Sequence, residues 1–90
     1  MDEMVEKRLA TMTERGRLSQ LAVSDTGFVF DPQTGLSFGT NETGLRTLNM
    51  LKGGCDLDET ARSLADEYGI PEEMALSGVE SFVKQLGRYL

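Results

Sequence analysis

Cys55 is the only cysteine of this 90-residue sequence, and it is the side chain with the greatest intrinsic reactivity as a nucleophile or metal ligand. A reactive or metal-bound thiolate needs electropositive surroundings, usually a histidine or another cation nearby. The sequence has no histidine, and Cys55 is followed by the carboxylates Asp56 and Asp58. One thiol among carboxylates is also a poor zinc site. We therefore predict no catalytic residue, no metal site and no cofactor, and we expect a protein that is not an enzyme.

The charge balance narrows the choice of partners. Acidic residues outnumber basic ones and give a net charge of −6 at pH 7, which opposes binding to a phosphate backbone or to an anionic membrane. No apolar run is long enough to span a bilayer, and Met1–Met4 lacks the basic start of a signal peptide. A single cysteine favours a reducing compartment. We expect a cytoplasmic protein that contacts neither nucleic acid nor membrane.

One stretch predicts a β-hairpin. In Phe28–Phe30 and in Leu36–Phe38, the larger apolar residues alternate along the chain, as they do in strands that present one row of side chains to a core. The segment Asp31–Gly35 between them carries aspartate, proline and a final glycine, which is typical of a type I turn closed by a glycine bulge. We predict that Phe30 and Phe38 are core residues.

The chain before this hairpin is harder to interpret. Residues 2–15 have helical apolar spacing but no good cap, which favours a loosely docked terminal helix, with disorder as the alternative. A short strand then leads through a turn at 24–27 into the hairpin, which gives a three-stranded antiparallel meander. We expect strands near 19–23, 27–31 and 35–39. The domain organisation expected is an N-terminal extension at 1–17, helical or mobile, and a folded domain at 18–90.

After the hairpin, the apolar period changes from two to that of a helix. Thr40 or Asn41 can cap a first helix, Asp56 begins a capping-box sequence for a second, and Pro71 suits the first turn of a third. These signals predict helices near 42–52, 57–68 and 71–87. The fold class expected is α+β, a winged-helix-like arrangement of a three-stranded antiparallel meander followed by three helices.

The third helix has a wider apolar arc than an ordinary surface helix. A central stripe of Ala75, Val79 and Leu86 has Leu76 and Val83 on one flank and Phe82 and Tyr89 on the other. Either the small domain uses the whole arc for its core, or one flank is left for a partner. If the Leu76 flank is spare, Val83→Asp should leave the fold intact.

Several of these segments together resemble a known family. They are Phe28-Val-Phe-Asp-Pro-Gln-Thr-Gly35, Asn41-Glu-Thr-Gly44, Leu51-Lys-Gly-Gly54, Ala61 and the stretch from Leu64 to Tyr68. In order and spacing they resemble the PqqD family, and more narrowly the PqqD-like proteins associated with the HPr-rel-A system, over about residues 19–90. The resemblance implies a RiPP recognition element, a peptide chaperone. Such a domain binds the leader of a ribosomally made precursor peptide and presents it to a modifying enzyme, which is a radical SAM protein in pyrroloquinoline quinone biosynthesis.

The predicted third strand offers a place for such a peptide. Gly35–Thr40 carries no charge and no proline, so it lacks the usual protection of an edge strand, and an extended peptide could pair with it. From the residues alone, a short solvated or covered edge is the stronger interpretation, and the resemblance favours peptide binding. The predicted peptide-binding residues are Leu36, Ser37, Phe38, Gly39, Leu76, Val79, Val83 and Leu86. The implied partners are a precursor leader peptide and a modifying enzyme such as a radical SAM protein, and we expect a monomer or a weak homodimer.

Two alternative functions remain open at this point. A winged helix often binds DNA through its third helix, but here that helix is rich in glutamate and the whole chain is acidic. The other alternative is a general protein-interaction module without a peptide client.

Overall fold

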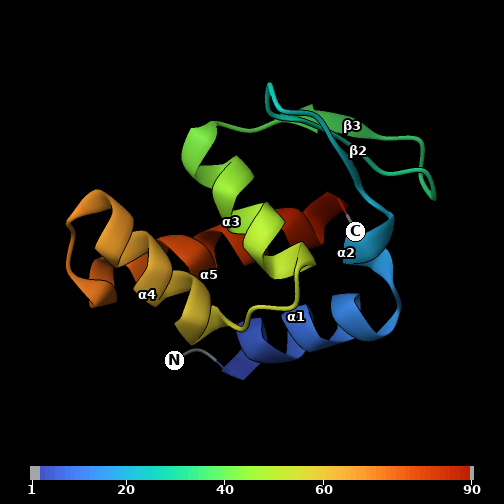
Figure 1. Ribbon diagram of the computed structural model, residues 1–90. Helices are drawn as coiled ribbons and strands as arrows, with labels where there is room; N and C mark the ends of the chain where they lie inside the picture. The colour runs from blue at the N-terminus through green and yellow to red at the C-terminus, as the bar shows by residue number, and fades with distance from the viewer. Residues whose placement is uncertain (1–2, 90) are drawn as a thin grey trace.

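The computed structural model describes residues 3–89 and shows an α+β fold, as predicted (Figure 1). In chain order the elements are α1 (Glu3–Glu14), α2 (Arg17–Gln20), β1 (Ala22–Val23), β2 (Phe28–Phe30), β3 (Ser37–Gly39), α3 (Glu42–Lys52), α4 (Leu57–Tyr68) and α5 (Glu72–Tyr89). The antiparallel sheet has the order β1-β2-β3 and is followed by three helices. The sheet lies on one side of these three helices, and α1 lies on the side away from the sheet (Figure 1).

Local turn chemistry sets the path of the sheet. The Ser24 amide donates to the Phe28 carbonyl (2.8 Å), and Gly27 has a φ of 94°, where a Cβ would collide with the Thr40 carbonyl. The predicted hairpin turn closes with a 2.8 Å bond from the Gly35 amide to the Asp31 carbonyl. Both predicted turns are therefore confirmed.

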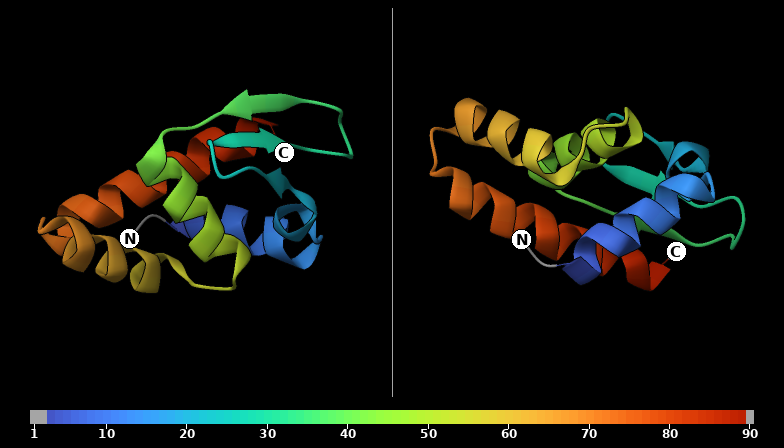
Figure 2. Two further views of the ribbon diagram at one scale, coloured as in Figure 1. Left: turned by 45° about the horizontal axis from the view of Figure 1, so that its top comes forward. Right: turned by 90° about the horizontal axis from the view of Figure 1, so that it is seen from below.

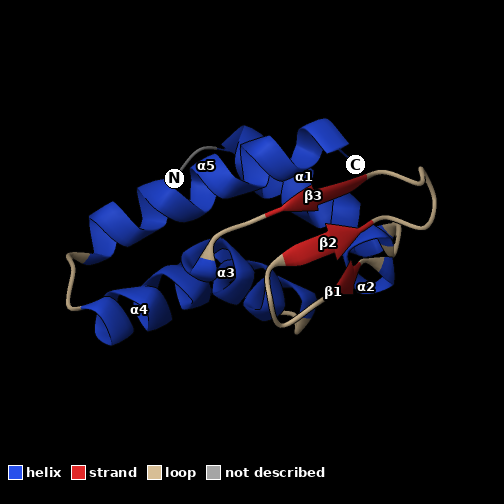
Figure 3. Cartoon of the chain, turned by 90° about the horizontal axis from the view of Figure 1, so that it is seen from above, coloured by secondary structure: helices blue, strands red, loops and turns tan. Residues whose placement is uncertain are grey.

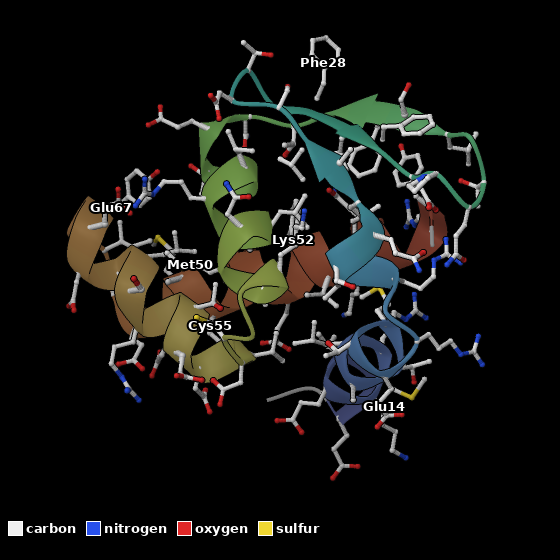
Figure 4. The ribbon with its side chains drawn as sticks, turned by 45° about the vertical axis from the view of Figure 1, so that its right-hand side comes forward. Glu14, Phe28, Met50, Lys52, Cys55 and Glu67 are labelled. Atoms are coloured by element: carbon white, nitrogen blue, oxygen red, sulfur yellow. The ribbon has the colours of Figure 1, made fainter. Side chains whose placement is uncertain are left out.

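The hairpin presents the opposite face of β2 to the core from the one that the sequence indicated. Val29 is fully buried, whereas Phe28 and Phe30 are 65% and 44% exposed, and Figure 4 shows Phe28 projecting away from the helices. Because side chains alternate along a strand, an inward Val29 requires both phenylalanines to face outward. The prediction that Phe30 is a core residue is wrong. Phe38, opposite Val29, is half-buried and packs against the core.

The predicted first strand is mostly a helical turn. Only Ala22–Val23 pairs with β2, while the residues before them form α2. Gly16, with a φ of 69°, ends α1 and redirects the chain into α2. Leu18 and Leu21 are both buried, because three residues in a helix return to the same face.

The N-terminal helix is part of the core. Val5, Leu9 and Met12 are buried, and α1 packs on α2 and across α5 (Figure 2, right). Gly87 lies directly against the Arg8 side chain, where the two helices meet. The sequence alone favoured a loosely docked helix, because its apolar spacing does not reveal the partner helix.

The remaining helices begin and end where the capping residues predict. The Asn41 carboxamide oxygen accepts a 2.8 Å bond from the Gly44 amide, and Asp56 forms a full capping box with Glu59. Gly69 ends α4 in the left-handed conformation. The predicted bounds of α3 and α4 are confirmed, and α5 extends slightly beyond its prediction.

A buried ion pair joins α2 to the hairpin turn. The Arg17 guanidinium lies 2.5 Å from a carboxylate oxygen of Asp31, which is 1% exposed. The Asp31 carboxylate also accepts bonds from the Gln33 amide (3.0 Å) and the Thr34 hydroxyl (3.1 Å). These contacts fix the turn that leads into β3.

Candidate functional site

β3 forms an open edge of the sheet. It pairs with β2 on one side only, and it is the strand nearest α5 (Figure 3). Ser37 and Gly39 are exposed, and the strand has neither a charged side chain nor a proline to block pairing with another chain. The predicted unprotected edge is therefore present in the structure.

The direction of hydrogen bonding alternates along β3. At the two ends of the strand, the Leu36 carbonyl accepts a bond from the β2 side (2.9 Å), and the Thr40 amide donates one to it (2.8 Å). In an antiparallel pair, residues that bond to the neighbour alternate with residues that do not. The N–H and C=O groups of Ser37 and Gly39 therefore point to the open edge, where an added strand could bond to them.

A groove runs beside this edge, along α5. One hollow of about 100 Å³ lies between β3 and the C-terminal half of α5, and a second of about 440 Å³ continues toward α3, α4 and the start of α5. Gly39, Thr40, Phe82 and Gln85 line both hollows, which makes them one groove, called here the β3–α5 groove. None of the described residues that line it is charged, although charged residues make up 27% of the chain. The groove therefore suits an uncharged guest.

The predicted site residues in β3 and directly before it lie together at the edge. Leu36 is half exposed, Ser37 and Gly39 are exposed, and Phe38 and Gly39 line the groove.

The α5 residues of the prediction are mostly part of the core. Val79, Val83 and Leu86 are all buried, although Val79 and Leu86 contribute to the base of the groove. Leu76 is half-buried and lines neither hollow. Val83 is fully enclosed, because α1 packs on α5 at Gly87, one turn further along the same face. The expectation that Val83→Asp leaves the fold intact is therefore wrong.

The accessible wall of the groove comes from the other flank of α5. Phe82, Gln85 and Tyr89 line it, and the rings of Phe38 and Tyr89 stack with their centroids 4.5 Å apart. The sequence identified both flanks but not which one α1 covers. The signal that favoured this flank was its two aromatic residues, since aromatic side chains are enriched at binding surfaces.

Other kinds of site find little support in the described residues. Within residues 3–89, no cluster of three metal-ligating side chains is close enough to hold an ion, and Cys55 is a half-buried free thiol. None of the helices in this range is both long and apolar enough to cross a membrane.

Comparison with known proteins identifies the family of the chain. The family model described as coenzyme PQQ synthesis protein D (PqqD) matches residues 27–89, a range that includes β2, β3 and all three later helices. The chain therefore belongs to the PqqD family. Neither the curated proteins nor the solved structures gave a significant match.

Proposed function

We propose that this PqqD-family protein captures the leader segment of a ribosomally made precursor peptide by strand addition and presents it to a modifying enzyme. The observation that carries the proposal is the open edge of β3, whose outward amides and carbonyls lie beside an uncharged groove. Membership of a family named for coenzyme PQQ synthesis supports an accessory, non-catalytic role. The enzyme would be of the radical SAM type, and the protein would act in the cytoplasm as a monomer or weak homodimer.

Backbone pairing supplies affinity in this proposal, and the groove supplies selectivity. Each hydrogen bond to the β3 edge contributes about 0.5–1.5 kcal/mol. A short added strand with an ordering cost then gives a Kd on the order of micromolar. Main-chain hydrogen bonds depend little on the sequence of the guest. Selectivity between guest peptides must therefore come from guest side chains that contact Phe38, Phe82 and Tyr89.

A titration of isotope-labelled protein tests the site. The peptide is a leader from a precursor encoded beside the gene, and the amides of residues 35–40 and of the Phe82–Tyr89 segment should shift. Shifts confined to β1 or α4 would place the guest elsewhere. Absence of binding to any such leader would favour a general interaction module.

A paired substitution tests strand addition itself. Ser37→Pro removes an amide that points to the open edge, so it should weaken leader binding by about tenfold or more while the protein stays folded. Ser37→Ala keeps the amide and should bind as the wild type does. Equal binding by the two variants would show that the guest does not pair with β3.

A further inference from the structure

A second groove lies between α1 and the connection from α3 to α4. Its volume is about 410 Å³, and Figure 4 shows Cys55 on that connection and Glu14 on α1, one on each of its walls. Leu9 and Leu57 are buried at its base, and Ala10 adds a further apolar surface. We call it the acidic groove because of the residues along its rim.

The rim carries only negative charge. Glu6 and Glu14 come from α1, and Asp56 and Asp58 come from the start of α4, while no lysine or arginine is among the described residues that line the groove. The Asp56 carboxylate caps α4, but Glu6, Glu14 and Asp58 form no ion pair within residues 3–89. An apolar floor between uncompensated carboxylates is complementary to an apolar ridge flanked by cations.

We propose that the acidic groove docks a helix of a partner protein. That helix would carry a row of leucine-like side chains along one face, with lysine or arginine on both sides of the row. One wall is α1, and the other is the connection from α3 to α4 with the first residues of α4. Neither wall contains a strand, so a helix in the groove is the matching mode. A second copy of this chain is a poor occupant, because it brings the same charge of −6.

The location makes this site independent of peptide capture. The acidic groove shares no lining residue with the β3–α5 groove, and α1 lies on the side of the molecule away from the sheet (Figure 1). Both grooves can therefore be occupied at once. α1, which forms one wall, precedes residues 27–89, the range that the family model matches. Part of the proposed site therefore lies outside the matched range.

The test uses a synthetic helical peptide of about 15 residues with leucines at positions i, i+3, i+4 and i+7 and lysines elsewhere. It is titrated into the isotope-labelled full chain at about 0.15 M salt, together with a matched peptide in which glutamate replaces lysine. The double variant Glu6→Gln/Glu14→Gln removes two rim charges. Asp66→Asn/Glu73→Gln removes two exposed charges outside the groove and serves as the control.

The lysine peptide should shift amides of α1 and of residues 54–58, and the glutamate peptide should not bind. The Glu6→Gln/Glu14→Gln variant should bind the lysine peptide about tenfold more weakly, and the control should bind it as the wild type does. Equal weakening in both variants would show non-specific attraction and overturn the proposal. Shifts confined to β3 and α5, or no binding at all, would also overturn it, whatever the outcome for the leader peptide.

Discussion

Asp31 is a buried aspartate whose carboxyl group stays ionised in the folded protein. Burial, the largest single influence, raises the pKa of its carboxyl group. The hydrogen bonds from the Gln33 amide, Arg17 and Thr34, together with the charge of Arg17, outweigh burial and hold the pKa below its usual value. The carboxyl group of Asp31 therefore stabilises the turn more strongly when it is ionised than when it is protonated.

Replacing Asp31 should be costly. Asp31→Ala leaves the Arg17 guanidinium, which is 16% exposed, without its partner and should lower the free energy of unfolding by about 3 kcal/mol. Urea denaturation measures this, with Asp25→Ala in an exposed turn as the control. Similar losses in the two variants would mean that the ion pair contributes little.

The same ion pair should have a pH signature. Because the folded pKa of Asp31 is depressed, its contribution is fully present above the unfolded pKa of about 4 and is lost as pH falls through the folded value. Between about pH 5 and pH 3, wild-type stability should therefore fall more steeply than that of Asp31→Asn. Urea midpoints across this range give the comparison, and parallel curves would contradict it.

The orientation of β2 leads to a further prediction. Val29→Ala should lower the free energy of unfolding by about 2 kcal/mol, because it opens a cavity at a fully buried position. Phe30→Ala should lower it by less than about 1 kcal/mol, although it removes a larger side chain, since Phe30 is 44% exposed. Thermal or urea unfolding ranks the two variants, and the reverse order would place Phe30 in the core after all.

At the scale of elements, α1 should be required for stability. Val5→Asp places a charge at a position that is 1% exposed, so it should cost at least about 3 kcal/mol. Thr11→Asp, on the exposed side of the same helix, is the matched control and should change stability little. Circular dichroism melting curves distinguish these variants, and equal melting temperatures would show that α1 is only loosely attached.

The elements that the sequence predicted well are those that local chemistry determines. The caps at Asn41 and Asp56 and the turn at Gly35 depend on residues within a few positions, and all three are present as predicted. The direction in which Val29 faces, and the docking of Val5, depend on contacts far along the chain, which periodicity does not specify.

The candidate site also has a part that the sequence predicts and a part that depends on tertiary packing. The absence of charge and proline in β3 predicts an unprotected edge, and the edge is present. The choice between the two flanks of α5 depends on where α1 packs, so the sequence assigned Val83 to the wall of the site when it belongs to the core. The tertiary arrangement identifies Phe82 and Gln85 as residues that line the groove.

At the scale of the whole molecule, net charge separates peptide binding from DNA binding. With a charge of −6, the protein should form no complex with random duplex DNA at about 10 μM protein and about 0.15 M salt, because counterion release offers no favourable term. A gel-shift assay checks this. A sub-micromolar complex that weakens with added salt would instead support a DNA-binding role.

The open edge of β3 also has a consequence for the lifetime of the proposed complex. Since β2 and β3 are already paired, their pairing need not break before a guest strand can bond to the open edge, and most of the ordering cost falls on the guest. Association at about 10⁵–10⁷ M⁻¹s⁻¹ with a Kd on the order of micromolar implies dissociation at roughly 0.1–10 per second. A guest would therefore stay bound for about a tenth of a second to ten seconds, long enough to meet an enzyme and short enough to be handed over.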